Sequence, residues 1–399
     1  MGPVSGSGEG VTRDRWLGSG RSAEVDACIA GSMAAREAIA GRDDGKLVVV
    51  FCSESYDLEA LSKGICSEAG DVPVIGCSTA GEIATDGPSD AGVVVVALGG
   101  PGFSVATGVG TEASVDLRGA TAKAVETCMA AVERRTHSVI LLLTDGLGGD
   151  QMEVVRGAYG VVGAEIPLVG GCAGDDLKMK RTYQLFDDRV LRDSVVAAAL
   201  SSDGPIGIGV RHGWRRVGDP MLVTGSHGSR VESLDDQPAL DVYLRRSGAP
   251  AAAHEDPDAF TRFALTHPLG ISRRNGEEVR FVAEAGFADR SIGCIASVPQ
   301  GGLAWIMEGD ADSVLEATDG ACADALGDFG EAPPLGLIAF DCIARRGVLG
   351  DAGIRQEIGR IAAVAGGAPV AGFYTYGEIA RTSGSRGFHN QTLVVLALG

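Results

Sequence analysis

A stretch of twelve residues occurs twice, once in each half of the chain. Residues 73–84 read PVIGCSTAGEIA and residues 369–380 read PVAGFYTYGEIA; the two agree without a gap at Pro, Val, Gly, Thr, Gly, Glu, Ile and Ala. A weaker third version, PLVGGCAGDD at residues 167–176, keeps the Pro, a Gly and an acid that follows a Gly. The repetition indicates a chain built from duplicated units.

The sequence around each version repeats as well. An apolar run precedes each one and another follows it, as at residues 47–51 (LVVVF) and 93–98 (VVVVAL). Such runs of β-branched and aliphatic residues predict strands buried on both faces. Residues 57–70 and 351–365, which lie between the first run and the motif, have helical character. We therefore predict an α/β fold of mixed β-sheets covered by helices, built from repeated β-α-β-β units with a tight Gly-Glu turn.

The order of patterns along the chain divides it into two domains. Residues 22–41 predict a helix that opens on a Ser cap, and the pattern changes near residue 204 to short strands separated by Gly-rich turns. We expect a disordered lead-in at residues 1–20, a first domain at residues 21–203 and a second domain at residues 204–399.

Charge and cysteine content limit the partners and the compartment. The formal net charge of −19 argues against nucleic acid and anionic membrane surfaces as partners. The nine cysteines, an odd number without CxxC spacing, fit buried thiols in a reducing compartment better than a disulfide scaffold or a zinc site. No signal peptide and no long apolar span is visible. We expect a cytoplasmic protein without membrane insertion.

Four separated motifs together resemble one protein family. They are PVIGCSTAGEI at residues 73–83, PALDVY at residues 238–243, HPLG at residues 267–270 and GFYTYGEIA…FHNQTLVVLAL within residues 372–398. In this order they are similar to the FIST sensory domain, an N-terminal half followed by a FIST-C half. The resemblance implies intracellular signal transduction by binding a small ligand, such as an amino acid or a similar polar metabolite. It also implies output through a separate partner, such as a kinase or a cyclase.

The candidate ligand-binding residues lie in and around the two strong versions of the motif and at the ends of nearby strands. Their side chains offer donors and acceptors fitted to a small polar ligand. The alternative is a structural turn whose polar side chains bond to nearby backbone. The candidates are Cys77, Ser78, Thr79, Glu82, Asp145, Cys342, Arg345, Tyr374, Tyr376, Glu378, His389, Asn390 and Gln391. We expect Tyr376, Glu378, His389 and Asn390 to line one cavity.

One cysteine is a candidate for unusual reactivity. Arg345, close in sequence to Cys342, could lower the pKa of that thiol or could clamp a carboxylate of the ligand. We expect Cys342 to react with thiol reagents before Cys28 or Cys128. The alternative is a buried, inert thiol.

Two other functions stay open. A haem-based gas sensor is implied by some members of the family, and His389, with His267 or His212, could supply an axial ligand, although no haem signature is present. An enzyme could use Cys342 and His389 in the same cleft, although no motif supports it. No catalytic residue and no other metal ligand is predicted, and the cofactor stays unknown.

Overall fold

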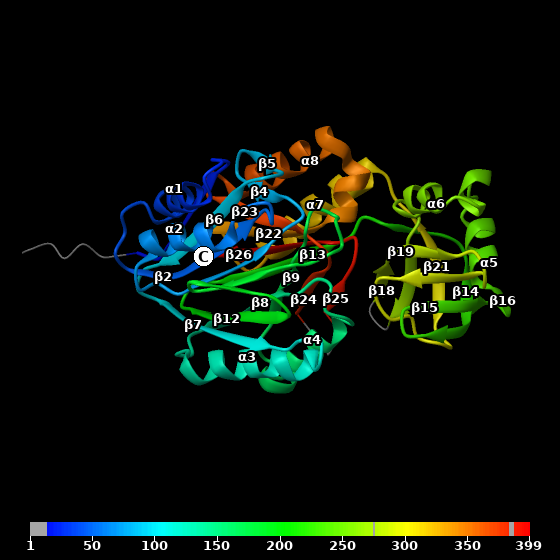
Figure 1. Cartoon of the computed structure of the whole chain (residues 1–399), viewed down its shortest axis with the longest axis horizontal. Coiled ribbons are helices and arrows are strands. Elements are labelled where there is room, and N and C mark those ends of the chain that lie inside the picture. The colour runs from blue at the N-terminus through cyan, green and yellow to red at the C-terminus, as the bar shows by residue number, and fades with distance from the viewer. Residues whose placement is uncertain (1–13, 274–275, 383–386) are drawn as a thin grey trace, which may run out of the picture.

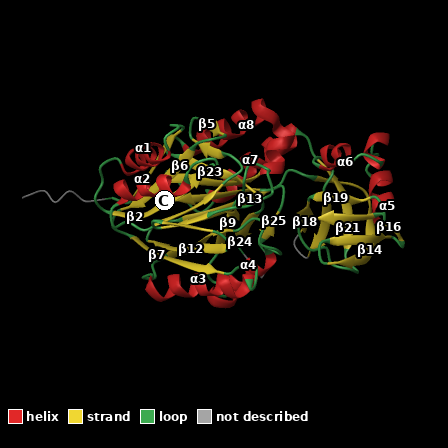
Figure 2. Ribbon diagram, in the orientation of Figure 1, coloured by secondary structure: helices red, strands yellow, loops and turns green. Residues whose placement is uncertain are grey.

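The computed structural model describes residues 14–273, 276–382 and 387–399. These residues form an α/β body with a smaller β-rich part beside it (Figure 1). Within them, three six-stranded sheets make up the body and one eight-stranded sheet makes up the smaller part. The predicted fold class is confirmed, because the sheets are mixed and helices cover them (Figure 2). Part of the expected lead-in lies outside the described residues, while strand β1 already begins at Trp16.

Each sheet of the body joins strands from distant parts of the chain. The first sheet runs β1 (Trp16–Ser22), β6 (Val93–Gly99), β2 (Gly45–Cys52), β3 (Val74–Ser78), β10 (Gln184–Phe186), β11 (Arg189–Leu191). The second runs β25 (Phe388–His389), β24 (Glu378–Arg381), β9 (Leu168–Cys172), β8 (His137–Thr144), β12 (Ser194–Ser202), β7 (Phe103–Thr111). The third runs β13 (Ile206–Arg211), β26 (Leu393–Leu398), β22 (Gly336–Cys342), β23 (Val370–Thr375), β4 (Glu82–Ala84), β5 (Gly87–Ser89).

One order of elements recurs in three segments of the chain, which we call the first unit (residues 46–100), the second unit (residues 138–200) and the third unit (residues 335–399). Each unit has a parallel strand pair, β2–β3, β8–β9 or β22–β23, joined by a helix. These helices are α2 (Leu58–Ala69), α4 (Met152–Val162) and α8 (Ile343–Ala365). A short hairpin and a last antiparallel strand follow in every unit.

The hairpin of each unit completes the sheet of another unit. Strand β4 of the first unit pairs with β23 of the third, and β24 of the third pairs with β9 of the second. Strand β10 of the second unit pairs with β3 of the first, which closes the exchange into a ring. Strand pairing therefore crosses residue 204, near which we expect a domain boundary, at two of the three hairpins.

Helix pairs cover the outer face of each sheet. Helices α1 (Ala27–Ile39) and α2 pack on the first sheet, α3 (Leu117–Ala131) and α4 on the second, and α7 (Ala311–Ala325) and α8 on the third. Helix α1 begins at Ala27 because the side chain of Asp26, and not the expected serine, accepts a hydrogen bond from the backbone N–H of Ile29.

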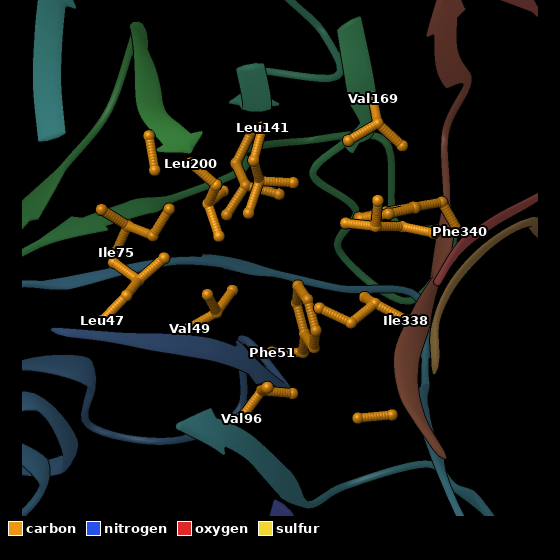
Figure 3. Packing of buried hydrophobic residues seen from close by; sticks show 14 of the residues in the cluster. Leu47, Val49, Phe51, Ile75, Val96, Leu141, Val169, Leu200, Ile338 and Phe340 are labelled. Carbon is orange, nitrogen blue, oxygen red and sulfur yellow. The ribbon is translucent and has the colours of Figure 1, made fainter. Parts of the chain in front are cut away.

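The inner faces of the three sheets share one hydrophobic core (Figure 3). Phe51 of β2 stacks on Phe373 of β23 with ring centroids 4.9 Å apart, and Phe340 of β22 meets Phe373 edge-on at 5.8 Å. Because each central strand packs against helices on one side and against this core on the other, its residues are mainly apolar, as the sequence pattern indicates.

Glycines in the short parallel strands permit close packing of the backbone. A Cβ atom at Gly170 or Gly372 would lie 1.9 Å from the carbonyl oxygen of Leu142 or Ala339, and the φ angles are +145° and +156°. A larger residue would therefore separate the parallel strands. The glycine of the first Gly-Glu turn, Gly81, has φ of +118°, as the turn requires.

The smaller part lies between β13 and α7 in sequence. Its sheet consists of β18 (Gly276–Arg280), β17 (Leu269–Arg273), β21 (Leu303–Glu308), β14 (Arg215–His227), β15 (Arg230–Leu234), β20 (Ser291–Cys294) and β19 (Val282–Gly286), with β16 (Gln237–Pro238) on β15. Its helices are α5 (Ala239–Arg246), a 3-10 turn (Ala251–His254) and α6 (Pro257–Ala264). It has a hydrophobic core of its own. Across the described parts of the chain, no helix combines the length and the apolar character needed to span a bilayer.

Candidate ligand-binding site

Two buried carboxyls occupy the Gly-Glu turns of the first and third units. The carboxyl of Glu82 accepts hydrogen bonds from the hydroxyl of Thr79 at 2.6 Å and from the backbone N–H of Gly92 at 3.1 Å. Glu378 accepts the equivalent bonds from the hydroxyl of Thr375 and the backbone N–H of Thr392. Both carboxyls are fully buried. Each side chain therefore fastens its own turn to the start of the strand that follows.

Burial sets the protonation of these two groups. It raises the pKa of Glu82 and of Glu378 to about 8, against the partial opposition of the hydrogen bonds from the neighbouring threonines. Both carboxyls are therefore largely protonated near neutral pH, which allows them to stay in an apolar setting without a cationic partner.

The second unit has an amide at this position. Gln184 opens β10 in the register position that Glu82 has in β4 and Glu378 has in β24. Its side chain is fully buried, and neither its nitrogen nor its oxygen has a hydrogen-bond partner among the described residues. The sequence suggested Asp175 as the acid of this unit, but Asp175 lies in a longer loop, residues 173–183, that precedes the hairpin.

Two candidates from the first unit have structural positions: Cys77 packs in the core, and Ser78 holds that loop. Cys77 is buried in the central core. The hydroxyl of Ser78 donates to the carbonyl oxygen of Gly174 at 2.8 Å and accepts from the backbone N–H of Tyr183 at 2.9 Å. Ser78 thus joins both ends of the 173–183 loop to the end of strand β3.

Arg345 is committed to carboxyls inside the protein. Its guanidinium, which is fully buried, donates to Asp341 at 2.7 Å and to Glu357 at 2.5 Å. Burial and the nearby Glu378 carboxyl raise the pKa of Cys342 well above its usual range. The expected activation of this thiol is therefore wrong, because the arginine is neutralised by two acids and the thiol is buried beside a third.

Exposure of the cysteines also reverses the expected order of reactivity. Cys28 is exposed on helix α1, Cys66 is half-buried, and Cys342 is buried. A thiol reagent should reach Cys28 first, which contradicts the expectation that Cys342 reacts before it.

The polar run at the head of the last strand lies where the body meets the smaller part. The Nε2 atom of His389 lies 2.9 Å from the carbonyl oxygen of Ala380, and burial lowers the pKa of this histidine. The side chain of Gln391 donates to the carbonyl oxygen of Leu265 in the smaller part at 2.8 Å. The Oδ1 atom of Asn390 and the Oε1 atom of Gln391 have no partner among the described residues, and the hydroxyl of Tyr374 has none either.

One candidate, Asp145, lines a cavity. The cavity has a volume of about 270 Å³ and lies at the carboxyl end of strand β8. The Oδ1 atom of Asp145 accepts from the hydroxyl of Thr182 at 2.7 Å and from the backbone N–H of Leu147 at 2.9 Å. The remaining lining residues are Lys180, Arg181, Arg192 and Asp193. Three elements of the second unit therefore form its wall: the loop after β8, the 173–183 loop and the turn before β12.

A tyrosine of the third unit holds the 173–183 loop in place. The hydroxyl of Tyr376 lies 2.5 Å from the Oδ1 atom of Asp175, and the Asp175 carboxyl also accepts from the backbone N–H groups of Met179, Lys180 and Arg181. Burial opposes ionisation of Asp175, but these hydrogen bonds prevail and lower its pKa. The predicted residue Tyr376 thus lies one hydrogen bond from the loop that lines the cavity.

Three cations of the cavity wall were missed by the sequence reasoning. Lys180 and Arg181 lie in the run LKMKR after the third, weaker version of the motif, and Arg192 lies in the turn before β12. The available signal was this basic run in an acidic chain, directly after a motif that had lost its regular turn. Sequence similarity to the strong versions directed attention away from it.

The fold and the site define an α/β protein with a small polar cavity at the ends of its strands. The sequence profile of the FIST N domain matches residues 46–237, and that of the FIST C domain matches residues 239–381. The chain belongs to the FIST family, whose domains are recognised as small-ligand sensory domains in signal transduction. The predicted resemblance is confirmed.

Individual relatives add little beyond this. An uncharacterised protein of Mycobacterium tuberculosis, matched in two strains, is 25% identical over 275 residues, which cover 65% of this chain and 68% of that protein. An uncharacterised protein of Methanocaldococcus jannaschii is 29% identical over 129 residues, 30% of this chain and 25% of that protein. Among solved structures, a cyanuric acid hydrolase from A. caulinodans gives a TM-score of 0.30 at 14% identity, covering 49% of this chain and 72% of the hydrolase.

Proposed function

We propose that this chain is a cytoplasmic sensory protein that binds a small polar ligand, an amino acid or a similar metabolite, and signals through a separate partner such as a kinase or cyclase. The observation that carries the proposal is the cavity beside Asp145 in a chain of the FIST family. It lies at the carboxyl end of a strand, where ligands of α/β sheets gather. Its polar wall offers the few oriented groups that a small-molecule site uses.

The contacts of the cavity wall connect a bound ligand to the first and third units, so binding can affect their structure. A ligand in the cavity touches the 173–183 loop, and this loop is bonded to Ser78 of the first unit and to Tyr376 of the third. A ligand that prefers one arrangement of this loop shifts the population of that arrangement by its difference in affinity. The partner protein would recognise the arrangement that the ligand favours.

A second location for the same ligand is the polar run Asn390–Gln391. Each of these two residues has a buried side-chain oxygen without a partner among the described residues. Buried acceptors of this kind are satisfied by a donor, either from a water or from a ligand. Among Tyr376, Glu378, His389 and Asn390, which we expect to line one cavity, Asn390 has such an acceptor, whereas Glu378 and His389 are hydrogen-bonded within the protein.

The other two functions receive less support from the geometry. The imidazole of His389, the first choice for an axial haem ligand, already has its Nε2 atom in a hydrogen bond with Ala380, so it does not fit an open iron position. A pair of Cys342 and His389 lacks the thiolate that such chemistry requires, because the pKa of Cys342 is strongly raised.

Native mass spectrometry of freshly purified protein tests the proposal. We expect a population whose mass exceeds that of the chain by one small molecule and which loses that molecule on mild activation. A visible absorption spectrum of the same sample tests for haem, since a Soret band would show that the protein is a haem-based sensor. Protein that carries no small molecule, and whose melting temperature no metabolite of a broad panel changes, would contradict the proposal.

A further inference from the structure

The wall of the cavity beside Asp145 carries three cations and two acids, and the cations are not paired with those acids. Lys180, Arg181 and Arg192 all line it, and none of them forms an ion pair within the described part of the chain. The chain has a net charge of −19, and many of its other arginines do pair with acids.

Two of these cations lie beside the same aromatic ring. The guanidinium carbons of Arg181 and Arg192 each lie 5.9 Å from the centre of the Tyr183 ring. The ring face attracts each cation, but two like charges gathered around one side chain repel each other. An anion bound near both cations would reduce that repulsion.

The two acids of the wall are bonded to neutral donors. Asp193 accepts from the backbone N–H and the hydroxyl of Ser114, and Asp145 accepts from Thr182 and Leu147. Neither acid pairs with the three cations. Asp145 instead ties the loop after β8 to the 173–183 loop through Thr182, and Asp193 ties the turn before β12 to Ser114, which precedes helix α3.

We infer that Lys180, Arg181 and Arg192 bind the anionic group, a carboxylate or a phosphate, of a small ligand held in this cavity. The inference rests on the proposed function, to which it adds the residues that hold the ligand and the charge of the ligand. Guanidinium groups suit this task because their planar forks match both carboxylate and phosphate oxygens. The volume of about 270 Å³ admits a small metabolite and excludes larger cofactors.

Calorimetric titration of the full chain tests the inference with three probes: succinate, inorganic phosphate, and succinamide, which has the shape of succinate without its charges. We expect succinate or phosphate to bind and succinamide not to bind. The better of the two anions identifies the source of the charge as carboxylate or phosphate. Arg181→Gln and Arg192→Gln should each weaken the bound probe about tenfold or more, since a hydrogen bond to a charged group is lost.

A matched control separates the cavity from general surface charge. Arg262 of helix α6 is exposed and has no ion pair within the described residues, so Arg262→Gln removes one charge from a distant surface. Its affinity for the probes should equal that of the natural chain. Far-ultraviolet circular dichroism and melting temperature should match in all three variants, because each altered side chain is exposed.

Several outcomes would overturn the inference. These are equal binding of succinate and succinamide, affinity unchanged in both cavity variants, or no binding of any probe at millimolar concentration. Native mass spectrometry of the Arg181→Gln/Arg192→Gln double variant distinguishes this failure from that of the proposed function. A small molecule retained by both the double variant and the natural chain would refute the anion site and leave the sensory role standing. If neither protein carries a small molecule and no metabolite of the broad panel changes the melting temperature of the natural chain, the sensory role itself is refuted.

Discussion

The first and third units keep a closed turn where the second unit has an open loop. In the two similar units, Glu82 and Glu378 each bond to a threonine before them and to a backbone N–H after them. In the second unit the side chain of the equivalent residue, Gln184, has no hydrogen-bond partner within the described parts of the chain, and a longer loop leads to it. The cavity with Asp145 lies beside this loop.

This difference shows that sequence similarity between repeated units marks residues with a structural role. A turn that needs the same hydrogen-bonding groups keeps the same residues in each unit, so the strongest internal match marks structural chemistry. The second unit, which lacks the Gly-Glu turn, does not need these hydrogen-bonding groups, so its residues can differ. In this chain the departure brings three cations and a cavity together, and the following experiments break or sharpen that contrast.

Removing the buried arginine of the third unit should have the largest effect. Arg345→Met leaves Asp341 and Glu357 buried without a cationic partner, and we expect the free energy of unfolding to fall by about 3–5 kcal/mol. Urea denaturation measures it. Arg346→Met is the control, because that arginine pairs with the exposed carboxyl of Asp90 and should change stability by about 1 kcal/mol or less. Equal losses in the two variants would refute the assignment of Arg345 to a buried network.

The two buried glutamates should make stability depend on pH. Each has a pKa of about 8 in the folded protein against 4.5 for the free group, so the unfolded chain releases its proton first as pH rises. Stability from protonated Glu82 and Glu378 is therefore complete below pH 4.5 and is lost as pH rises toward 8.

Replacing these acids by glutamine should remove that loss. At pH 5 we expect Glu82→Gln and Glu378→Gln to change the free energy of unfolding little. At pH 8 each variant should be more stable than the natural chain, by on the order of 1–3 kcal/mol for each site. Denaturation curves across this range measure it. The reverse change, Gln184→Glu, should introduce the same pH dependence into the second unit. If stability depended on pH in the same way in the natural chain and in all three variants, these side chains would not titrate as argued.

Freeing the loop of the second unit from the third should have a moderate effect. Tyr376→Phe deletes the hydrogen bond from its hydroxyl to Asp175, and we expect a loss of about 1–2 kcal/mol in stability. The amides of residues 173–183 should exchange faster with solvent, because the loop loses its tie to the body. Unchanged exchange in this loop would mean that Ser78 and the backbone contacts of Asp175 suffice to hold it.

The smallest structural effect concerns the thiols. Alkylation should modify Cys28 first and Cys66 next, without change in the fold, because these two are the accessible ones. Cys342 should stay unmodified until the chain unfolds, since burial raises its pKa. Mass-spectrometric footprinting reads the order, and early labelling of Cys342 would show that its surroundings open in solution.

Much of the fold followed from the sequence because it rests on local patterns. Apolar runs bounded by glycine and proline gave the strands, and the spacing of apolar residues gave the helices of each unit. The exchange of hairpins between units could not be predicted, because a strand such as β4 looks the same whether it pairs with its own unit or with β23. The position of Gln184 opposite Cys77 depends on the same exchange, because β10 pairs with β3 of the first unit.

The site was predicted less well, for physical reasons that particular residues show. Asp145 was found because it ends a buried strand, and Tyr376 because it lies in a repeated motif. Lys180, Arg181 and Arg192 were missed because solvated cations are common on surfaces and only the fold shows that these three share a cavity. Glu378 was selected because a polar group beside a strand suggests a ligand, whereas its bonds to Thr375 and Thr392 serve the turn.

One comparison of two variants tests the central claim that the open second unit, and not the closed turns, holds the ligand. Native mass spectrometry should be carried out on Arg192→Gln and Glu378→Gln, purified in parallel with the natural chain. The account predicts that the small molecule retained by the natural chain is lost from Arg192→Gln and kept by Glu378→Gln. A molecule kept by Arg192→Gln and lost from Glu378→Gln, with both proteins folded, would contradict it and return the site to the C-terminal turn.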